Sequence, residues 1–284
     1  MKLFYSFAFL LIASTFSFGQ VNLPKQSQKQ EVRQTVGDTT VSIVYSRPNV
    51  RGRKVWGGLV PYNEVWRAGA DENTTVEFTR DVTVDGKDIP AGKYGFHVLP
   101  TENEMTLIFS KDNDKWGSFS YRQENDALRL TVKPIKAQFE ESLSYSFSDV
   151  TVSSAKVSLA WGEIAISFTV DTGDVHSRSL QALRAAISAR AGDDIRPMTQ
   201  GASYVLSFQL KPYYQEAISW LDIALKSRET FALLSSKSRL LAADGMTKDA
   251  ISVGEKAIAM GKSANPPANT ADFERFVTGL KSQQ

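Results

Sequence analysis

Cysteine is missing from this sequence, and histidine occurs only twice in its 284 residues. The chain therefore forms no disulfide and offers no thiol for a lipoprotein anchor. Two histidines without any cysteine also make a zinc site improbable, and we predict no metal and no cofactor. Stability must come from hydrophobic cores alone, and the length suffices for two domains with a core each.

An excess of one charge is also missing, since 33 basic residues face 31 acidic ones. Proteins that bind nucleic acid or an anionic membrane surface carry a strongly basic face. The balance therefore argues against nucleic acid or a membrane surface as the main partner.

Long apolar runs are absent except at the N-terminus. An apolar run extends from Leu3 to about Ala13 behind Lys2, and the small residues Ser17 and Gly19 follow with the spacing that a signal peptidase needs. We predict a signal peptide at residues 1–19 and a flexible leader at residues 20–30. The alternative is an uncleaved anchor, although about 20 apolar residues are expected for a membrane span. After cleavage the protein would be periplasmic or extracellular, without a membrane segment.

Residues 31–172 show the pattern of many short strands. Val41, Ile43 and Tyr45 alternate with polar residues, which is typical of a half-buried strand. Asp85-Gly86 is a hairpin signal, and further short alternating stretches follow at close intervals. We predict an antiparallel β-sandwich or barrel-like N-terminal domain.

Residues 173–284 have a helical composition, so the fold class is α+β with segregated domains. Apolar spacing predicts helices within residues 176–190 and 212–227, and two more on either side of Asp244-Gly245. Small residues at Ala217 and Ala224 recur 33 residues later at Ala250 and Ala257, which resembles a tetratricopeptide repeat. A plain helical bundle is the alternative.

The most distinctive run extends from Tyr45 to Phe78. Glycines interrupt it too often for a regular strand or helix, so we predict a long structured loop, the kind of segment in which binding residues gather. Tryptophan and arginine together suit a sugar ring or a carboxylate ligand. The candidate ligand-binding residues are Arg47, Arg53, Trp56, Tyr62, Glu64, Trp66, Arg67, Asp71 and Glu72. The alternative is structural: Trp56 and Trp66 would close one end of the sandwich, and Arg47 or Arg67 would pair with Glu64 or Asp71.

This run resembles a bacterial family called "domain of unknown function 2911". The resemblance rests on YSRPNVRGRKVWGGLVPYNEVWRAGADENTTVEF, VDGKDIPAGKYGFHVLP and KWGSFSYRQENDALRLTV, and it covers roughly Lys29 to Val170. It implies an exported protein of the Bacteroidota, in which tetratricopeptide-like helices often follow the β-domain. It implies no chemistry, because the family has no assigned activity.

No catalytic motif is recognisable. The sequence contains no G-x-S-x-G, no H-E-x-x-H, no P-loop and no dinucleotide-binding glycine pattern. His97 is expected to be structural, and His176 to have a helix-cap or linker role. Asp112, Asn113 and Asp114 suggest a calcium loop, but Trp116 stands at the fifth position, which needs an oxygen ligand, and Gln123 at the twelfth, which needs a bidentate glutamate. A hairpin turn is favoured, and an irregular calcium site is the alternative.

We therefore expect an exported binding protein. Because no catalytic motif is recognisable, a non-catalytic protein is favoured over an enzyme, although the sequence leaves the question open. The loop at residues 47–72 would bind a glycan or carboxylate ligand, and the helices would dock an envelope protein partner. One alternative is an envelope hydrolase acting on a glycan or peptide, for which paired carboxylates would be needed. Another is a purely structural assembly protein.

Overall fold

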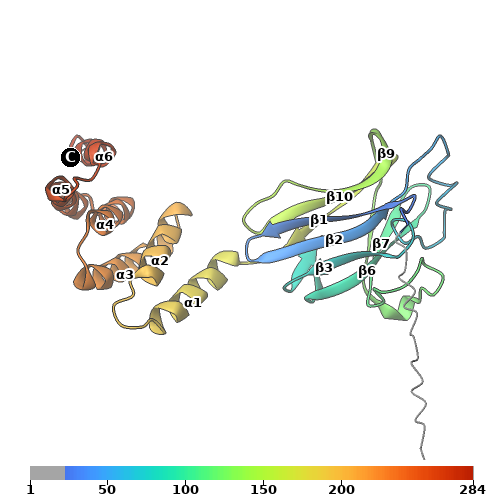
Figure 1. Cartoon of the computed structure of the whole chain (residues 1–284), viewed down its shortest axis with the longest axis horizontal. Coiled ribbons are helices and arrows are strands. Elements are labelled where there is room, and N and C mark those ends of the chain that lie inside the picture. Colours follow the sequence, from blue (N-terminus) through green and yellow to red (C-terminus); the bar gives the residue numbers. More distant parts are fainter. Residues whose placement is uncertain (1–22, 284) are drawn as a thin grey trace, which may run out of the picture. The chain divides into compact units, whose positions relative to one another are not determined.

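The computed structural model describes residues 23–283. The chain forms two compact units that divide between Thr172 and Gly173 (Figure 1). The predicted signal peptide lies outside the described residues. The first strand begins at Gln28, so the end of the segment predicted as a leader already belongs to a sheet.

A six-stranded antiparallel sheet forms one layer of the first unit, in the order β1-β2-β3-β6-β7-β8. Its strands are β1 (Gln28–Val36), β2 (Thr39–Arg47), β3 (Thr74–Phe78), β6 (Gly92–Pro100), β7 (Met105–Ser110) and β8 (Asp126–Val132). In β2 the residues Val41, Ile43 and Tyr45 are buried, as their alternation predicts.

A four-stranded sheet forms the second layer, in the order β5-β4-β10-β9. Its strands are β4 (Val82–Val84), β5 (Lys87–Ile89), β9 (Ile135–Ser148) and β10 (Ser154–Asp171). Inward-facing residues of both sheets form one hydrophobic core that includes Phe96 and Phe168, 5.8 Å apart between ring centroids. The fold class is thereby confirmed: an antiparallel β-sandwich precedes a helical region.

A β-bulge at Gly162 interrupts the pairing of β10 with β9. Before it the buried residues have odd numbers, ending at Trp161, and after it they have even numbers, from Ile166 onward. The alternation of side chains changes at this irregularity, and β10 continues through it as one strand.

The Asp85-Gly86 hairpin is also confirmed, since Val84 pairs with Lys87 across it. Asp85 and Gly86 have φ angles of 46° and 78°. Positive values at both central positions are what a two-residue turn of this handedness requires.

The second unit contains six α-helices in the part of the chain that the structure describes (Figure 1). They are α1 (Val175–Ser188), α2 (Arg196–Ser207), α3 (Tyr214–Ser227), α4 (Phe231–Ala243), α5 (Thr247–Ser263) and α6 (Ala271–Lys281). A short 3-10 turn, η2 (Lys211–Tyr213), precedes α3, and another, η1 (Gln123–Asn125), precedes β8 in the first unit. Helical periodicity predicts α1, α3, α4 and α5, and the structure adds α2 and α6. Among residues 23–283, no helix has the length and apolarity that a bilayer crossing needs.

His176 does not cap α1. It lies inside the helix, and its Nδ1 is 2.8 Å from the hydroxyl of Tyr204 in α2. The cap is Asp174, whose carboxylate accepts a hydrogen bond of 2.9 Å from the backbone N–H of Ser177. A carboxylate at this position satisfies an N–H group that has no partner within the helix.

Candidate functional site

The glycine-rich run forms an excursion of residues 48–73 between β2 and β3. Its backbone is tied to both sheets: Val50 donates to the carbonyl of Glu141 in β9 at 2.8 Å, and Trp66 and Val98 exchange two hydrogen bonds of 2.8 Å. The loop prediction is correct, and this loop is anchored along its length.

Four non-glycine residues of the excursion adopt left-handed backbone conformations, namely Arg51, Asn63, Ala68 and Asp71. Such conformations cost free energy and persist only where surrounding contacts hold them. The excursion is therefore a specified structure.

Three tryptophans meet where the excursion crosses the end of the sandwich. The rings of Trp66 and Trp161 stack with centroids 5.7 Å apart, and Trp56 meets Trp66 edge-on at 5.6 Å. The indole of Trp56 is buried and donates to the carbonyl of Trp161 at 3.1 Å. This cluster joins the excursion to the core through the second sheet.

Arg47 at the end of β2 and Arg53 in the excursion donate side-chain hydrogen bonds to backbone carbonyl groups. Arg47 donates to the carbonyl of Leu143 at 2.9 Å, and Arg53 donates to the carbonyls of Val50 and Asn49 at 3.0 and 2.7 Å. The expected ion pairs of Arg47 or Arg67 with Glu64 or Asp71 do not form among the described residues. The carbonyl contacts are available because the loop leaves many backbone oxygens outside regular pairing.

A hollow of about 240 Å³ lies beside the stacked tryptophans, and we call it the arginine hollow. No aspartate or glutamate lines it among the described residues. The polar and aromatic side chains at its wall come from Gln26, Ser27, Asn49, Arg51, Arg53, Trp66, Arg67 and Trp161. Three guanidinium groups without a carboxylate make a site that favours an anion.

Two buried N–H groups at this wall have no acceptor. Neither Nε of Arg67 nor Nε1 of Trp161 makes a hydrogen bond within the described part of the chain. A buried donor without an acceptor costs about 1–3 kcal/mol. Burial lowers the pKa of Arg67, while the nearby Asp71 carboxylate raises it.

The predicted site residues separate into several places. Arg53, Trp66 and Arg67 lie together at the arginine hollow. Trp56 and Tyr62 line a second hollow, which Arg53 also borders. The remaining candidates lie elsewhere: Arg47 donates to the carbonyl of Leu143 in β9, Glu64 is exposed, Asp71 does not line either hollow, and Glu72 pairs with Lys25 at 2.7 Å.

Five polar or aromatic wall residues are absent from the predicted set: Gln26, Ser27, Asn49, Arg51 and Trp161. Arg51 and Asn49 lie in or next to the same run, so their composition signal was available. Trp161 gives no such signal, because it lies in β10 and reaches the hollow only through the packing of the two sheets.

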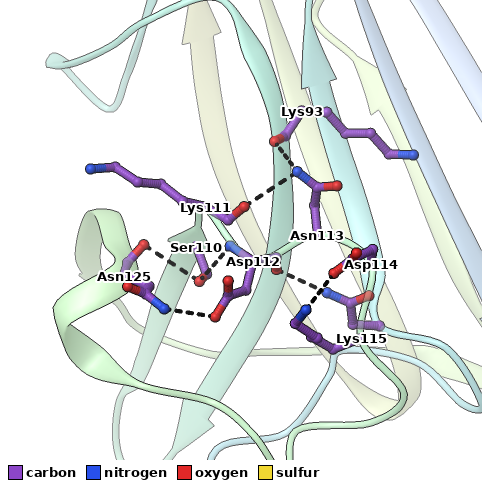
Figure 2. Close-up of polar contacts among 9 residues, drawn as sticks. Lys93, Ser110, Lys111, Asp112, Asn113, Asp114, Lys115 and Asn125 are labelled. Atoms are coloured by element: carbon purple, nitrogen blue, oxygen red, sulfur yellow. Dashed lines mark hydrogen bonds and ion pairs between the residues drawn. The ribbon is translucent and has the colours of Figure 1, made fainter.

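The connection between β7 and β8 holds the Asp112–Asp114 segment against the sheet (Figure 2). The Asp112 carboxylate accepts from the side chain of Asn125 at 2.8 Å, and Asn113 donates to the carbonyl of Lys93 at 2.8 Å. Asp114 pairs with Lys115 at 2.8 Å. These carboxylates take part in local polar contacts, and the segment is a longer connection than the predicted hairpin turn.

His97 lies beneath the same connection and is only 3% exposed. Its Nδ1 is 3.1 Å from the hydroxyl of Ser118. Burial lowers its pKa to about 4, although Asp126 and Asp112 act in the opposite direction. The imidazole is thus held neutral, which agrees with a structural histidine.

Comparison with known proteins gives one family match. The family described as "Protein of unknown function (DUF2911)" matches residues 27–170, which include the whole excursion and all the described strands except the last residue of β10. Searches of curated proteins and of solved structures return no match. The match covers just over half of the 284 residues, and the chain therefore belongs to the DUF2911 family.

Proposed function

We propose that this protein is an exported binding protein that holds an anionic ligand, a sugar acid, in the arginine hollow. The observation that carries the proposal is the wall of the arginine hollow, which has three guanidinium groups and no carboxylate among the described residues. A carboxylate accepts hydrogen bonds from guanidinium and indole N–H groups alike. The half-buried ring of Trp66 lines the hollow and adds an apolar surface, to which a sugar ring can pack.

The test is thermal unfolding of the full chain with glucuronate and, separately, with glucose. A ligand that binds the folded state raises the unfolding temperature by mass action. We expect a concentration-dependent rise with glucuronate and none with glucose, because the two differ by the carboxylate.

Arg67→Gln should abolish the rise, because it removes the charge and the buried donor. Arg33→Gln is the matched control, since Arg33 lies on β1 and pairs with Glu31 at the surface. Equal responses to the two sugars, or an undiminished response in Arg67→Gln, would refute the proposal.

Export is proposed from the N-terminal sequence alone. N-terminal sequencing of the protein recovered from the periplasm or medium should begin at Gln20, the residue after the predicted cleavage site. Recovery only from the cytoplasm, with Met1 retained, would contradict this part of the proposal.

Partner docking is proposed for the helical unit. A groove of about 310 Å³ between α3, α4 and α5 has apolar walls that include Ile218 and Leu241, and its rim carries the Lys237–Asp222 ion pair. Tetratricopeptide-like helices use such concave surfaces for proteins. Co-purification from the cell envelope should recover partner proteins with the full chain and none with a chain truncated after Asp174. Unchanged partners would assign docking to the β-unit.

The hydrolase alternative gains no support from the arginine hollow. Catalysis on a glycosidic bond uses two carboxyl groups, and no carboxylate lines this hollow among the described residues.

A further inference from the structure

A second hollow of about 410 Å³ lies next to the arginine hollow, and the two share Arg53. The charged and aromatic side chains that line it are those of Arg53, Lys54, Trp56, Tyr62, Phe139 and Glu163. Aromatic rings thus stand beside charged groups of both signs, whereas the arginine hollow has only cationic ones.

Arg53 is fixed in place between the two hollows. Its Nε and Nη2 groups donate to the carbonyls of Val50 and Asn49, which leaves Nη1 without a hydrogen bond among the described residues. A guanidinium immobilised in this way can bind a ligand atom with little further loss of side-chain freedom.

The bulge at Gly162 assigns neighbouring residues to different hollows. Trp161 lines the arginine hollow, and Glu163 lines the second hollow. Bulges redirect side chains in this manner and often occur beside binding sites. One strand therefore supplies an indole to one hollow and a carboxylate to the next.

Besides the buried Trp56, the aromatic wall of the second hollow has the fixed ring of Tyr62 and the exposed ring of Phe139. A Cβ atom on Gly57 would lie 2.6 Å from Cε2 of Tyr62, so the ring lies directly on the glycine backbone. Phe139 projects from β9 and is 53% exposed. Rings in these two states offer an apolar surface at the edge of a polar hollow.

We propose that the two hollows are adjacent subsites for an acidic oligosaccharide, an inference that rests on the proposed function. The carboxylate of a sugar acid lies in the arginine hollow. The neighbouring sugar is neutral and packs its apolar face on Phe139 and Tyr62. Its hydroxyl groups bond to Lys54 and Glu163.

Charge and shape favour this occupant over a diacid or a small free acid. Glu163 offsets part of the positive charge of Arg53 and Lys54, so the second hollow favours a second carboxylate less than the arginine hollow does, and its own carboxylate accepts hydrogen bonds from hydroxyl groups. A sugar ring also combines an apolar face with hydroxyl groups at its rim, and the second hollow presents partners for both. A free sugar acid would leave this second hollow unused.

Titration calorimetry of the full chain tests the inference with three probes: glucuronic acid, a glucuronosyl-galactose disaccharide and a dipeptide of glutamate and phenylalanine. We expect the disaccharide to bind at least about tenfold more tightly than glucuronic acid, from the added contacts with aromatic faces. Phe139→Ala should remove this gain and leave the affinity for glucuronic acid unchanged. Phe119→Ala is the matched control, because that ring is 89% exposed on a different connection.

The outcomes separate this inference from the function on which it rests. Equal affinity for glucuronic acid and the disaccharide, with no effect of Phe139→Ala, would overturn the second subsite and leave the anion site standing. Tighter binding of the dipeptide than of the disaccharide would overturn it in favour of a peptide. Failure of all three probes to bind would overturn the proposed function itself.

Discussion

Trp56 donates its indole N–H to the backbone carbonyl of Trp161, 105 residues away, at 3.1 Å. This bond attaches the excursion between β2 and β3 to the bulged segment of β10. Because the Trp56 ring also meets Trp66, its position fixes the walls of both hollows.

Trp56→Ala should therefore destabilise the β-unit strongly. Loss of a buried aromatic side chain costs about 3–5 kcal/mol, since the cavity left behind adds to the lost burial. Denaturant unfolding followed by circular dichroism measures this change. Trp116→Ala is the control, because Trp116 is 58% exposed, and it should cost less than about 1 kcal/mol. Similar losses in both variants would show that Trp56 does not anchor the excursion.

His97 should make stability depend on pH. Its pKa is about 4 in the folded chain against an ordinary value of 6.5, so the unfolded state binds the proton more readily between these values. Stability therefore falls as the pH is lowered from 6.5 towards 4. Below pH 4 this histidine causes no further loss of stability. The shift corresponds to at most about 3 kcal/mol.

The measurement compares unfolding free energies of the original chain and His97→Asn across this pH range. The difference between them should change with pH, because asparagine has no proton to bind. Ser118→Ala should keep the original pH dependence, since burial is the main cause of the lowered pKa. A difference that stays constant with pH would count against a buried neutral imidazole.

Two glycines in the helical unit should respond oppositely to alanine. A Cβ atom on Gly254 in α5 would lie 2.6 Å from Cγ2 of Val277, whereas one on Gly279 in α6 meets nothing within 4 Å. Gly254→Ala should destabilise by about 1–3 kcal/mol through overpacking. Gly279→Ala should stabilise by up to about 1 kcal/mol through helix propensity. Thermal unfolding checks the signs, and a stabilising Gly254→Ala would contradict the close approach of α5 and α6.

Tyr145 and Thr74 should couple through one acceptor. Both hydroxyl groups donate to the carbonyl of Ala68, at 2.9 and 3.0 Å. Tyr145→Phe or Thr74→Val alone leaves the carbonyl with one donor and should cost about 1 kcal/mol. The double variant leaves a buried carbonyl without either donor, so its loss should exceed the sum of the single losses. Strict additivity in denaturant unfolding would contradict this shared role.

Local patterns in the sequence predict much of the fold. The alternation in β2, the Asp85-Gly86 turn and the helical spacing of α1, α3, α4 and α5 all depend on residues close together along the chain. Helix α2 is less visible, because it contains Gly201, which is a poor helix former. A Cβ atom on Gly201 would lie 2.6 Å from Cζ3 of Trp220 in α3, so packing between helices explains the glycine.

The candidate site is only partly visible in the sequence. The run from Tyr45 to Phe78 contains Arg53, Trp66 and Arg67, which the structure brings together at the arginine hollow. It contains Glu64 and Glu72 as well, which lie away from that hollow. Proximity along an irregular loop does not fix which side chains converge, because no constant period relates position to direction.

By itself the sequence determined the family, the order of a β-rich and a helical region, and the loop that carries the arginines. The tertiary structure decided that Trp161 and Glu163 complete two neighbouring hollows around Arg53. The reason is that strand and helix periods arise from local backbone geometry, whereas a binding surface requires residues from distant strands. Their meeting depends on sheet packing and on the bulge at Gly162.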